Sequence, residues 1–229
     1  MDKLIRSIKF PIVFDVQKLK SDLDKIIDAK WVDHYNVNDY SGKWTSIALL
    51  STTGKSDAIF ATSQGTEKLM PTDILESCFY FKEILDGFLF EKTSVRLLQL
   101  AVGAEVKPHS DNCLGYEDGS FRLHIPIITN TGVEFILDGN RLIMNEGECW
   151  YIDANFIHSV ANKGNQDRIH LVIDGIRNDW TDALFYKEAD PEQFIKLPKQ
   201  ISEEEKRLMI AELERMNTPA SNDILKNLA

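Results

Sequence analysis

The chain has 229 residues, of which 43% are hydrophobic and 27% are charged, so it is long and apolar enough to fold around one full core. Its formal net charge of −10 argues against nucleic acid or an anionic membrane surface as a partner, because both require clustered lysine and arginine. No apolar run approaches the roughly 20 residues that a helix needs to cross a bilayer.

The first 90 residues are expected to hold two strands and two helices. Residues 5–14 are apolar with some alternation and predict a strand, and Asp15 is a suitable N-cap for the helix that follows. The first 13 residues lack the continuous apolar stretch of a secretory signal peptide. Residues 44–50 predict a strand. Residues 71–87 predict one helix, which is apolar over much of its surface and should pack on a sheet.

From residue 94 the pattern changes to short strands separated by turn residues, and Asp138-Gly139-Asn140 is a hairpin signal. Many short strands at near-even spacing are typical of double-sheet folds. We therefore expect a mainly β fold with a jelly-roll core (a double-stranded β-helix, as in cupins) and flanking helices on one outer face. The candidate strands are 95–102, 120–128, 133–137, 141–144, 149–152 and 169–173.

After residue 190 the composition becomes charged and helical. Ser202 and Glu205 have the spacing of a capping box, which predicts the start of a helix. We expect one domain over residues 1–190 and a helical extension over 191–229. The sequence does not fix the oligomeric state.

The cysteines are few, odd in number and widely spaced, at Cys78, Cys113 and Cys149. This usage favours reduced thiols in a cytoplasmic protein over a disulfide framework. None of them has CxxC spacing, so a thiolate metal site is not expected.

Four of the five histidines lie between residues 109 and 170. His109 and Asp111 are two positions apart, so along a strand they would project to the same face. Asp111 and His158 are 47 positions apart, which is enough for several strands to bring the chain back to the same end of the jelly roll. Two imidazoles and one carboxylate on one face of an octahedral ion leave three positions open, as in non-haem Fe(II) oxygenases. An isolated HxD pair would more simply be a surface pair.

Arg168 follows His158 by 10 positions and strengthens the metal interpretation. An arginine on the next strand of a barrel can reach inward and pair with a carboxylate. A metal with three open positions and a nearby arginine is what 2-oxoglutarate requires. Its keto acid end would occupy two of the open metal positions, and its far carboxylate would pair with the guanidinium. The third open metal position is then left for dioxygen.

Five motifs occur in this order: His109-Ser110-Asp111, Arg122-Leu123-His124-Ile125-Pro126, Trp150-Tyr151-Ile152-Asp153, His158-Ser159-Val160-Ala161-Asn162 and Arg168-Ile169-His170-Leu171-Val172-Ile173-Asp174. The ordered set resembles the aspartyl/asparaginyl β-hydroxylase family of Fe(II)/2-oxoglutarate-dependent oxygenases, with a leaning toward the proline cis-hydroxylases. The resemblance covers roughly residues 94 to 175.

The resemblance implies a hydroxylase that acts on a C–H bond of an amino acid, either free or as a residue of a peptide or protein. The implied metal ligands are His109, Asp111 and His158. Arg168 would hold the distal carboxylate of 2-oxoglutarate, and His124 would lie near this cosubstrate. Arg122 would contact the substrate through a carboxylate.

Two other functions fit the same residues. A metal-dependent cupin with non-redox chemistry would use zinc or manganese and would not need Arg168 for a cosubstrate. A non-catalytic binding module would use the pocket or the C-terminal helix for a partner.

The roles of two further polar residues stay open. Arg96 lies among the apolar residues of a predicted strand. Its side chain either faces solvent or reaches a pocket, and the sequence does not decide between these two orientations. His170 should share the face of Arg168. We expect it to pack in the core, although it could also support Arg168 or contact the cosubstrate.

Overall fold

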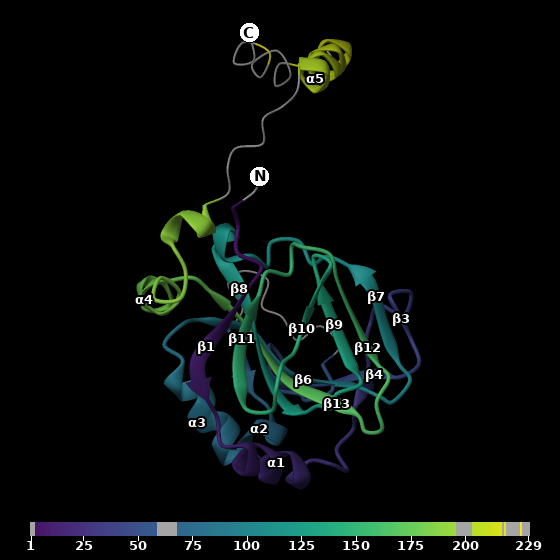
Figure 1. Cartoon of the computed structure of the whole chain (residues 1–229), viewed down its shortest axis with the longest axis vertical. Helices are drawn as coiled ribbons and strands as arrows, with labels where there is room; N and C mark the ends of the chain where they lie inside the picture. Colours follow the sequence, from purple (N-terminus) through teal and green to yellow (C-terminus); the bar gives the residue numbers. More distant parts are fainter. Residues whose placement is uncertain (1–2, 59–67, 196–202, 217, 219–224, 226–229) are drawn as a thin grey trace. The chain divides into compact units, whose positions relative to one another are not determined.

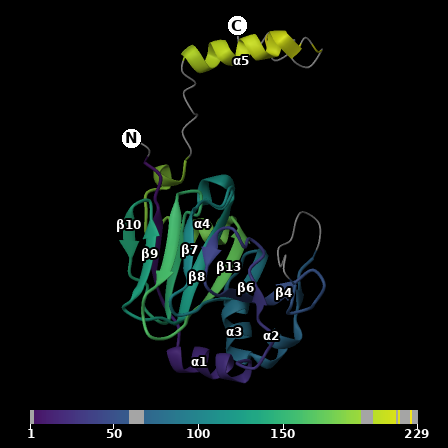
Figure 2. The same ribbon diagram turned by 90° about the vertical axis from the view of Figure 1, so that its right-hand side faces the viewer.

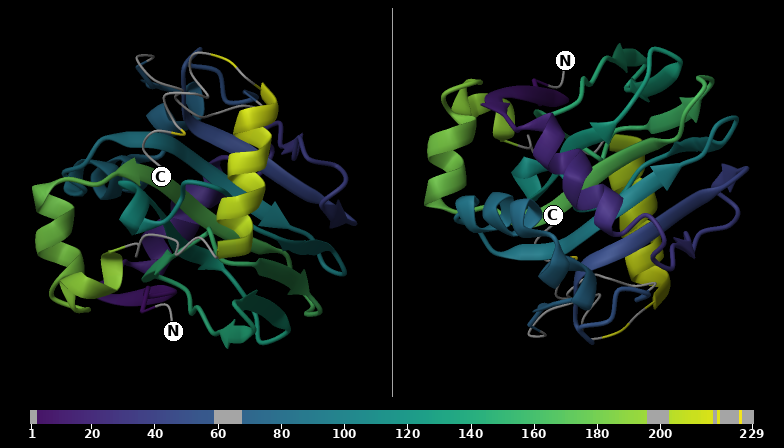
Figure 3. Two further views of the ribbon diagram at one scale, coloured as in Figure 1. Left: turned by 90° about the horizontal axis from the view of Figure 1, so that it is seen from above. Right: turned by 90° about the horizontal axis from the view of Figure 1, so that it is seen from below.

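A computed structural model describes residues 3–58, 68–195, 203–216, 218 and 225. Two antiparallel sheets face each other, and the N-terminal helices cover the outer face of the larger sheet (Figures 1, 2 and 3). This arrangement confirms the predicted mainly β fold with a jelly-roll core and flanking helices.

The larger sheet has the order β1 (Ser7–Val13), β11 (Glu148–Ile152), β8 (Ser120–Ile128), β13 (Arg168–Ile176), β6 (Lys92–Leu100), β4 (Trp44–Ser51) and β2 (Val32–Asp33), and β5 (Met70–Pro71) also pairs with β4. The smaller sheet has the order β10 (Asn140–Leu142), β9 (Val133–Leu137), β12 (His158–Asn162), β7 (Glu105–His109) and β3 (Tyr40–Ser41). The space between these two sheets holds the candidate site.

Strand β13 shows how the sequence divides its side chains between two cores. Successive side chains of a strand point to opposite faces. Leu171 and Ile173 belong to the cluster under the helices, whereas Val172 belongs to the cluster between the sheets. The same alternation places Arg168, His170 and Asp174 on the inner face with Val172. The polar residues of β13 are therefore buried inside the jelly roll rather than exposed.

The helices on the outer face are α1 (Val16–Lys25), α2 (Asp73–Ser77) and α3 (Phe79–Gly87). The prediction of one continuous helix over residues 71–87 is wrong, because the helix breaks at Cys78. The carboxylate of Asp22 in α1 accepts the backbone N–H groups of Tyr80 at 2.7 Å and Phe81 at 3.0 Å. It thereby satisfies backbone N–H groups in the first turn of α3. In a continuous helix these N–H groups would bond to carbonyls of the preceding turn and would not need this carboxylate.

Several elements were absent from the sequence-based prediction. Strands β7 and β12 are short, and three of the five residues in each are polar, so their apolar periodicity is weak. Helix α4 (Asp179–Phe185) and the 3₁₀ turns η1 (Tyr116–Asp118) and η2 (Pro191–Phe194) were also missed. The omission matters because β7 and β12 carry the two histidines of the candidate site.

Helix α5 (Glu203–Met216) belongs to a second compact unit, which follows Ile195, whereas η2 belongs to the first. A helix after residue 202 agrees with the predicted helical C-terminal segment, although Ser202 itself lies outside the described residues. The division at residue 190 stays a prediction. Within the described residues, no helix has both the length and the apolarity to cross a membrane.

Candidate metal centre

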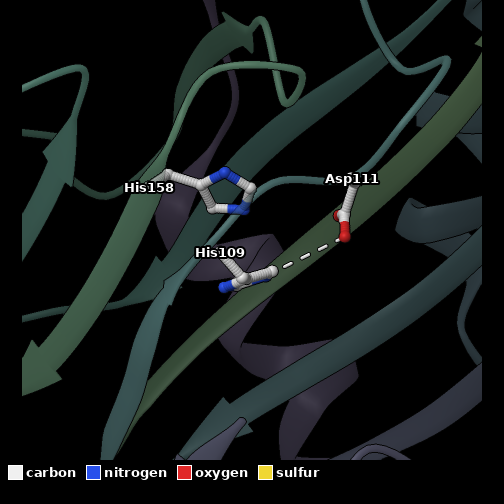
Figure 4. A group of neighbouring side chains, drawn as sticks. All are labelled: His109, Asp111 and His158. Atoms are coloured by element: carbon white, nitrogen blue, oxygen red, sulfur yellow. Dashed lines mark ion pairs between the residues drawn. The ribbon is translucent and has the colours of Figure 1, made fainter.

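His109, Asp111 and His158 come together at one end of the smaller sheet (Figure 4). His109 ends β7 and His158 begins β12, and the two residues are directly opposite each other in this strand pair. Asp111 lies beyond the end of β7, where its backbone N–H donates to the carbonyl of Ala154 at 2.8 Å. Each residue offers one ligand atom, and these atoms lie within 4.8 Å of one another. The expected strand geometry thus holds for His109, while a loop positions Asp111.

Both imidazole rings present Nε2 to the space between the three side chains. Nδ1 of His109 lies 2.8 Å from the carbonyl oxygen of Lys107, and Nδ1 of His158 lies 3.0 Å from that of Phe156. A carbonyl can only accept, so Nδ1 of each ring carries a hydrogen, and Nε2 is the nitrogen that can offer a lone pair to a metal. Burial lowers the pKa of His158 to about 4, which keeps this ring neutral near pH 7. Neutral imidazoles held by backbone carbonyls are typical metal ligands.

Asp111 supplies the anionic oxygen of the group. Burial alone would raise its pKa, but the guanidinium of Arg122 and the neighbouring His158 outweigh burial and lower the pKa. Arg122 forms an ion pair with Asp111 through Nη1. Two imidazole nitrogens and one carboxylate fit a divalent first-row metal such as Fe(II).

Arg122 is held by a second carboxylate, that of Asp174. Its Nε donates to Asp174 Oδ1 at 2.7 Å and its Nη2 to Oδ2 at 3.0 Å, because the two residues are directly opposite on β8 and β13. Burial would lower the pKa of Arg122, but Asp174 reverses this effect and raises it. Arg122, expected to contact the substrate, does line the pocket, with three of its donors engaged by carboxylates. A substrate contact through its remaining donors stays a prediction.

Arg168 has a different environment from Arg122. Only 3% of its surface is exposed, and no carboxylate of the described residues forms an ion pair with it. Its Nη2 donates to His170 Nδ1 at 2.8 Å, while Nε has no partner in the part of the chain that the structure describes. Burial lowers the pKa of Arg168 to about 9. A buried guanidinium without a counter-ion is a strong candidate to receive an anionic ligand.

His124 extends this buried polar group. Its Nδ1 lies 3.4 Å from Nδ1 of His170, and Nε2 of each ring has no partner among the described residues. Burial, and then the charge of Arg168, lower the pKa of both histidines well below its usual range. His170 is thus a core residue, as expected, but it also contacts Arg168.

All six residues predicted for the site line one cavity of about 590 Å³: His109, Asp111, Arg122, His124, His158 and Arg168. The cavity is also lined by Arg96, whose role the sequence left open, and by Trp44. His34 and Asp174, to which the sequence had assigned no role, line it as well. His34 stacks on Trp44 with 3.6 Å between ring centroids, and no sequence signal pointed to it. Arg96 and Asp174 had a signal, namely a charged side chain that shares a strand face with other inward residues.

The chain is similar to several known proteins. The family model described as Aspartyl/Asparaginyl beta-hydroxylase matches residues 14–178. An L-proline cis-4-hydroxylase from Rhizobium meliloti (strain 1021) is 28% identical over 193 residues, which cover 82% of this chain and 64% of that protein. An L-proline cis-3-hydroxylase 1 from a Streptomyces species is 29% identical over 171 residues, which cover 71% of this chain and 57% of that protein. The chain therefore spans less than two thirds of the length of these curated relatives.

Among solved structures, an oxidoreductase of the 2OG-Fe(II) oxygenase family from Burkholderia pseudomallei has a TM-score of 0.50 and 13% sequence identity. The match covers 75% of this chain and 86% of that one. At this level of identity the likeness concerns the fold.

Proposed function

The chain belongs to the aspartyl/asparaginyl β-hydroxylase family, and we propose that it is an Fe(II)- and 2-oxoglutarate-dependent dioxygenase. In this proposal it hydroxylates a C–H bond of an amino acid, either free or within a peptide. One observation carries the proposal: three side chains that could ligate a metal line the same cavity as a buried arginine that has no carboxylate partner among the described residues. The named activities of the proline hydroxylase relatives support it further.

The proposal assigns Fe(II) to His109, Asp111 and His158. Fe(II), when bound with 2-oxoglutarate and dioxygen, supplies the oxidising chemistry that converts C–H into C–OH. The donor set supports this assignment, because the Nδ1 hydrogen bonds leave Nε2 of both rings for a metal, and the lowered pKa of Asp111 keeps its carboxyl ionised. The protein's part is to fix these three ligands before the metal arrives.

Arg168 is assigned to the distal carboxylate of 2-oxoglutarate. This anion would supply the counter-ion that the guanidinium lacks and an acceptor for its unpartnered Nε. His124 would lie beside the cosubstrate, because it lines the cavity and its Nε2 has no partner among the described residues. The apolar part of the lining would exclude water from the reacting atoms; it includes Leu98, Val106, Phe135, Ile152 and Val160.

Arg122 and Asp174 are assigned to positioning the site. The two hydrogen bonds from Arg122 to Asp174 fix the guanidinium, and its Nη1 then orients the Asp111 carboxylate. The expected contact between Arg122 and a substrate carboxylate is kept as part of the proposal.

Turnover with a substrate panel tests the proposed reaction. The protein, Fe(II), 2-oxoglutarate and oxygen are incubated with L-proline, the other L-amino acids and short peptides, and succinate is measured together with the mass of the product. We expect succinate to form together with a product that has gained one oxygen atom. His158→Ala is the matched inactive control. Iron-loaded protein that consumes no 2-oxoglutarate with any of these compounds would favour a non-redox cupin.

We also propose that residues 1–190 are the catalytic domain, that residues 191–229 are a helical extension, and that the protein works in the cytoplasm. All three cysteines are free, as expected for a reducing compartment. Limited proteolysis tests the division, and the expected first cleavage lies between residues 190 and 203.

A further inference from the structure

A second cavity, of about 690 Å³, lies between the two sheets at the end away from the metal ligands. In the β9–β12 pair, His158 lies opposite Leu137 at one end, and Asn162 lies opposite Val133 at the other. His158 lines the first cavity, whereas Val133 lines the second. A volume of this size is typical of small-molecule sites. This distal cavity is lined in part by Val133, Phe135, Arg141, Leu142, Met144 and His170.

His170 brings an unused hydrogen-bond donor to the distal cavity. Only 2% of its surface is exposed, and burial lowers its pKa well below the usual range, so the ring is neutral. Its Nδ1 accepts a hydrogen bond from Arg168 at 2.8 Å, so Nε2 carries the hydrogen. Nε2 has no partner among the described residues. A buried donor without an acceptor is costly, so a ligand that offers His170 an acceptor would be stabilised here.

The charges around the distal cavity favour an anion at its rim. Arg141 and Glu146 are the charged side chains of its lining. Glu146 is already paired with Lys20 at 2.6 Å. The charge of Arg141 also acts on Glu134 of β9, but that carboxylate pairs with Lys163 at 2.6 Å. Arg141 itself is exposed and forms no ion pair within the described part of the chain. A ligand carboxylate would supply its counter-ion.

Apolar side chains form the wall that the distal cavity shares with the core between the sheets. Val133, Phe135, Leu142 and Met144 all belong to this core or pack against it. Phe135 lines both cavities and lies parallel to the ring of His158, with 6.3 Å between ring centroids. A ligand that fits has an apolar body and a polar group at each end.

We propose that the distal cavity is a regulatory site for an amphipathic carboxylate, whose charged group pairs with Arg141 and whose inner end accepts a hydrogen bond from His170. The inference rests on the proposed function, because the event that it regulates is the binding of 2-oxoglutarate at Arg168. The inner group is an uncharged acceptor such as a ketone or an amide. A second carboxylate would lie beside a neutral histidine and would have no counter-ion once Arg168 is paired with the cosubstrate.

Occupancy of the distal cavity should tighten the binding of 2-oxoglutarate. An acceptor on Nε2 polarises the imidazole of His170 and makes Nδ1 a stronger acceptor for Arg168. The guanidinium is then held in place before the cosubstrate arrives, which lowers the ordering cost of binding. By linkage, 2-oxoglutarate strengthens the binding of the regulatory ligand by the same factor.

Calorimetry on the full chain measures binding to the distal cavity. The protein is loaded with Fe(II) and saturating 2-oxoglutarate without oxygen, so that Arg168 is occupied. The probes are straight-chain carboxylates of about six to ten carbon atoms with a ketone at the penultimate carbon. Each is compared with the acid that lacks the ketone and with the amide that lacks the charge. We expect either deletion to weaken binding about 3- to 10-fold. Absence of binding by every oxo acid, or unchanged affinity after either deletion, would overturn the inference.

Variants at the rim locate the bound probe. Arg141→Gln should weaken binding of the oxo acid about 3- to 10-fold, and Arg141→Glu should weaken it further, because the charge is reversed. Ile143→Asp should also weaken binding, since Ile143 lines the cavity, is 70% exposed and leaves Arg141 in place. Arg207→Gln, which removes an exposed arginine of α5, is the matched control and should bind as the wild type does. Unchanged affinity in the Arg141 and Ile143 variants would place the probe elsewhere and contradict the inference.

The link to the cosubstrate has its own measurement. 2-Oxoglutarate is titrated into Fe(II)-loaded protein without oxygen, with and without the tightest-binding oxo acid, and the visible charge-transfer band is followed. We expect the oxo acid to tighten 2-oxoglutarate binding about 5-fold or more in the wild type and to have no effect in Arg141→Glu. Unchanged or weaker binding of 2-oxoglutarate would overturn the regulatory role.

Failure of this inference is distinguishable from failure of the proposed function. Wild-type protein that binds iron but forms no charge-transfer band contradicts the oxygenase itself. A band that forms, but whose dependence on 2-oxoglutarate does not respond to any oxo acid, contradicts only the regulatory site.

Discussion

The guanidinium of Arg168 donates a hydrogen bond to Nδ1 of His170, two residues further along β13, over 2.8 Å. Arginine has no acceptor, so Nδ1 of His170 must be the unprotonated nitrogen of that ring. His170 therefore restrains the arginine that we assign to the cosubstrate.

We predict that His170→Leu weakens 2-oxoglutarate binding by up to about 10-fold, because the guanidinium loses the acceptor that orients it. His170→Asn should retain most of the affinity, since its amide oxygen can take the place of Nδ1. Titration of 2-oxoglutarate into the metal-loaded variants checks this. Iron affinity should not change. If the leucine variant binds 2-oxoglutarate as tightly as the wild type does, His170 has only a packing role.

Arg168→Ala should lower the affinity for 2-oxoglutarate at least about 100-fold, because it removes one partner of a buried charge pair. Iron affinity should stay within about 2-fold, since Arg168 does not contact the three ligands. Parallel titrations with Fe(II) and with 2-oxoglutarate separate the two effects. Equal losses of both would mean that Arg168 has a structural role.

Asp22→Ala should destabilise the fold by about 1–2 kcal/mol, the usual cost of losing a helix cap. The carboxylate caps the first turn of α3 from a different helix, so its loss leaves two backbone N–H groups unpaired, one partly buried and one buried. Denaturant unfolding measures the change. Asp24→Asn, on the exposed side of α1, is the control and should change stability little. Equal stability of the two variants would contradict the capping role.

Asp153 should make stability depend on pH. Burial, and then the charge of Glu117, raise its pKa to about 7. A carboxyl that is protonated more easily in the folded chain stabilises the fold below its ordinary pKa, near about 3.9, and this contribution is lost as pH rises through about 7.

The unfolding temperature of the wild type should therefore fall between pH 5 and pH 8.5 by more than that of Asp153→Asn. Asparagine keeps the oxygen that accepts the N–H of Asn155 at 3.0 Å, so the loop geometry is retained. Thermal unfolding at several pH values gives the comparison. Parallel pH profiles for the two proteins would count against this assignment.

The sequence predicted those parts of the site that depend on local periodicity. The inward direction of Arg168 follows from the alternation of β13, and the three candidate metal ligands follow from spacing and donor type. The partners of Arg122 and Arg96 depend on strand register between residues far apart in the chain, which periodicity does not give. The break at Cys78 was missed for the same reason, since its cause is a carboxylate from α1. Strands β7 and β12 were missed because their apolar alternation is short.

The central claim is that one cavity binds Fe(II) through His109, Asp111 and His158 and 2-oxoglutarate through Arg168. The most direct test is an anaerobic titration of 2-oxoglutarate into Fe(II)-loaded protein, with the visible charge-transfer band of a chelated keto acid as the signal. We predict a saturable band in the wild type that weakens in Asp111→Ala and in Arg168→Ala. Wild-type protein that holds iron and gives no band would contradict the account.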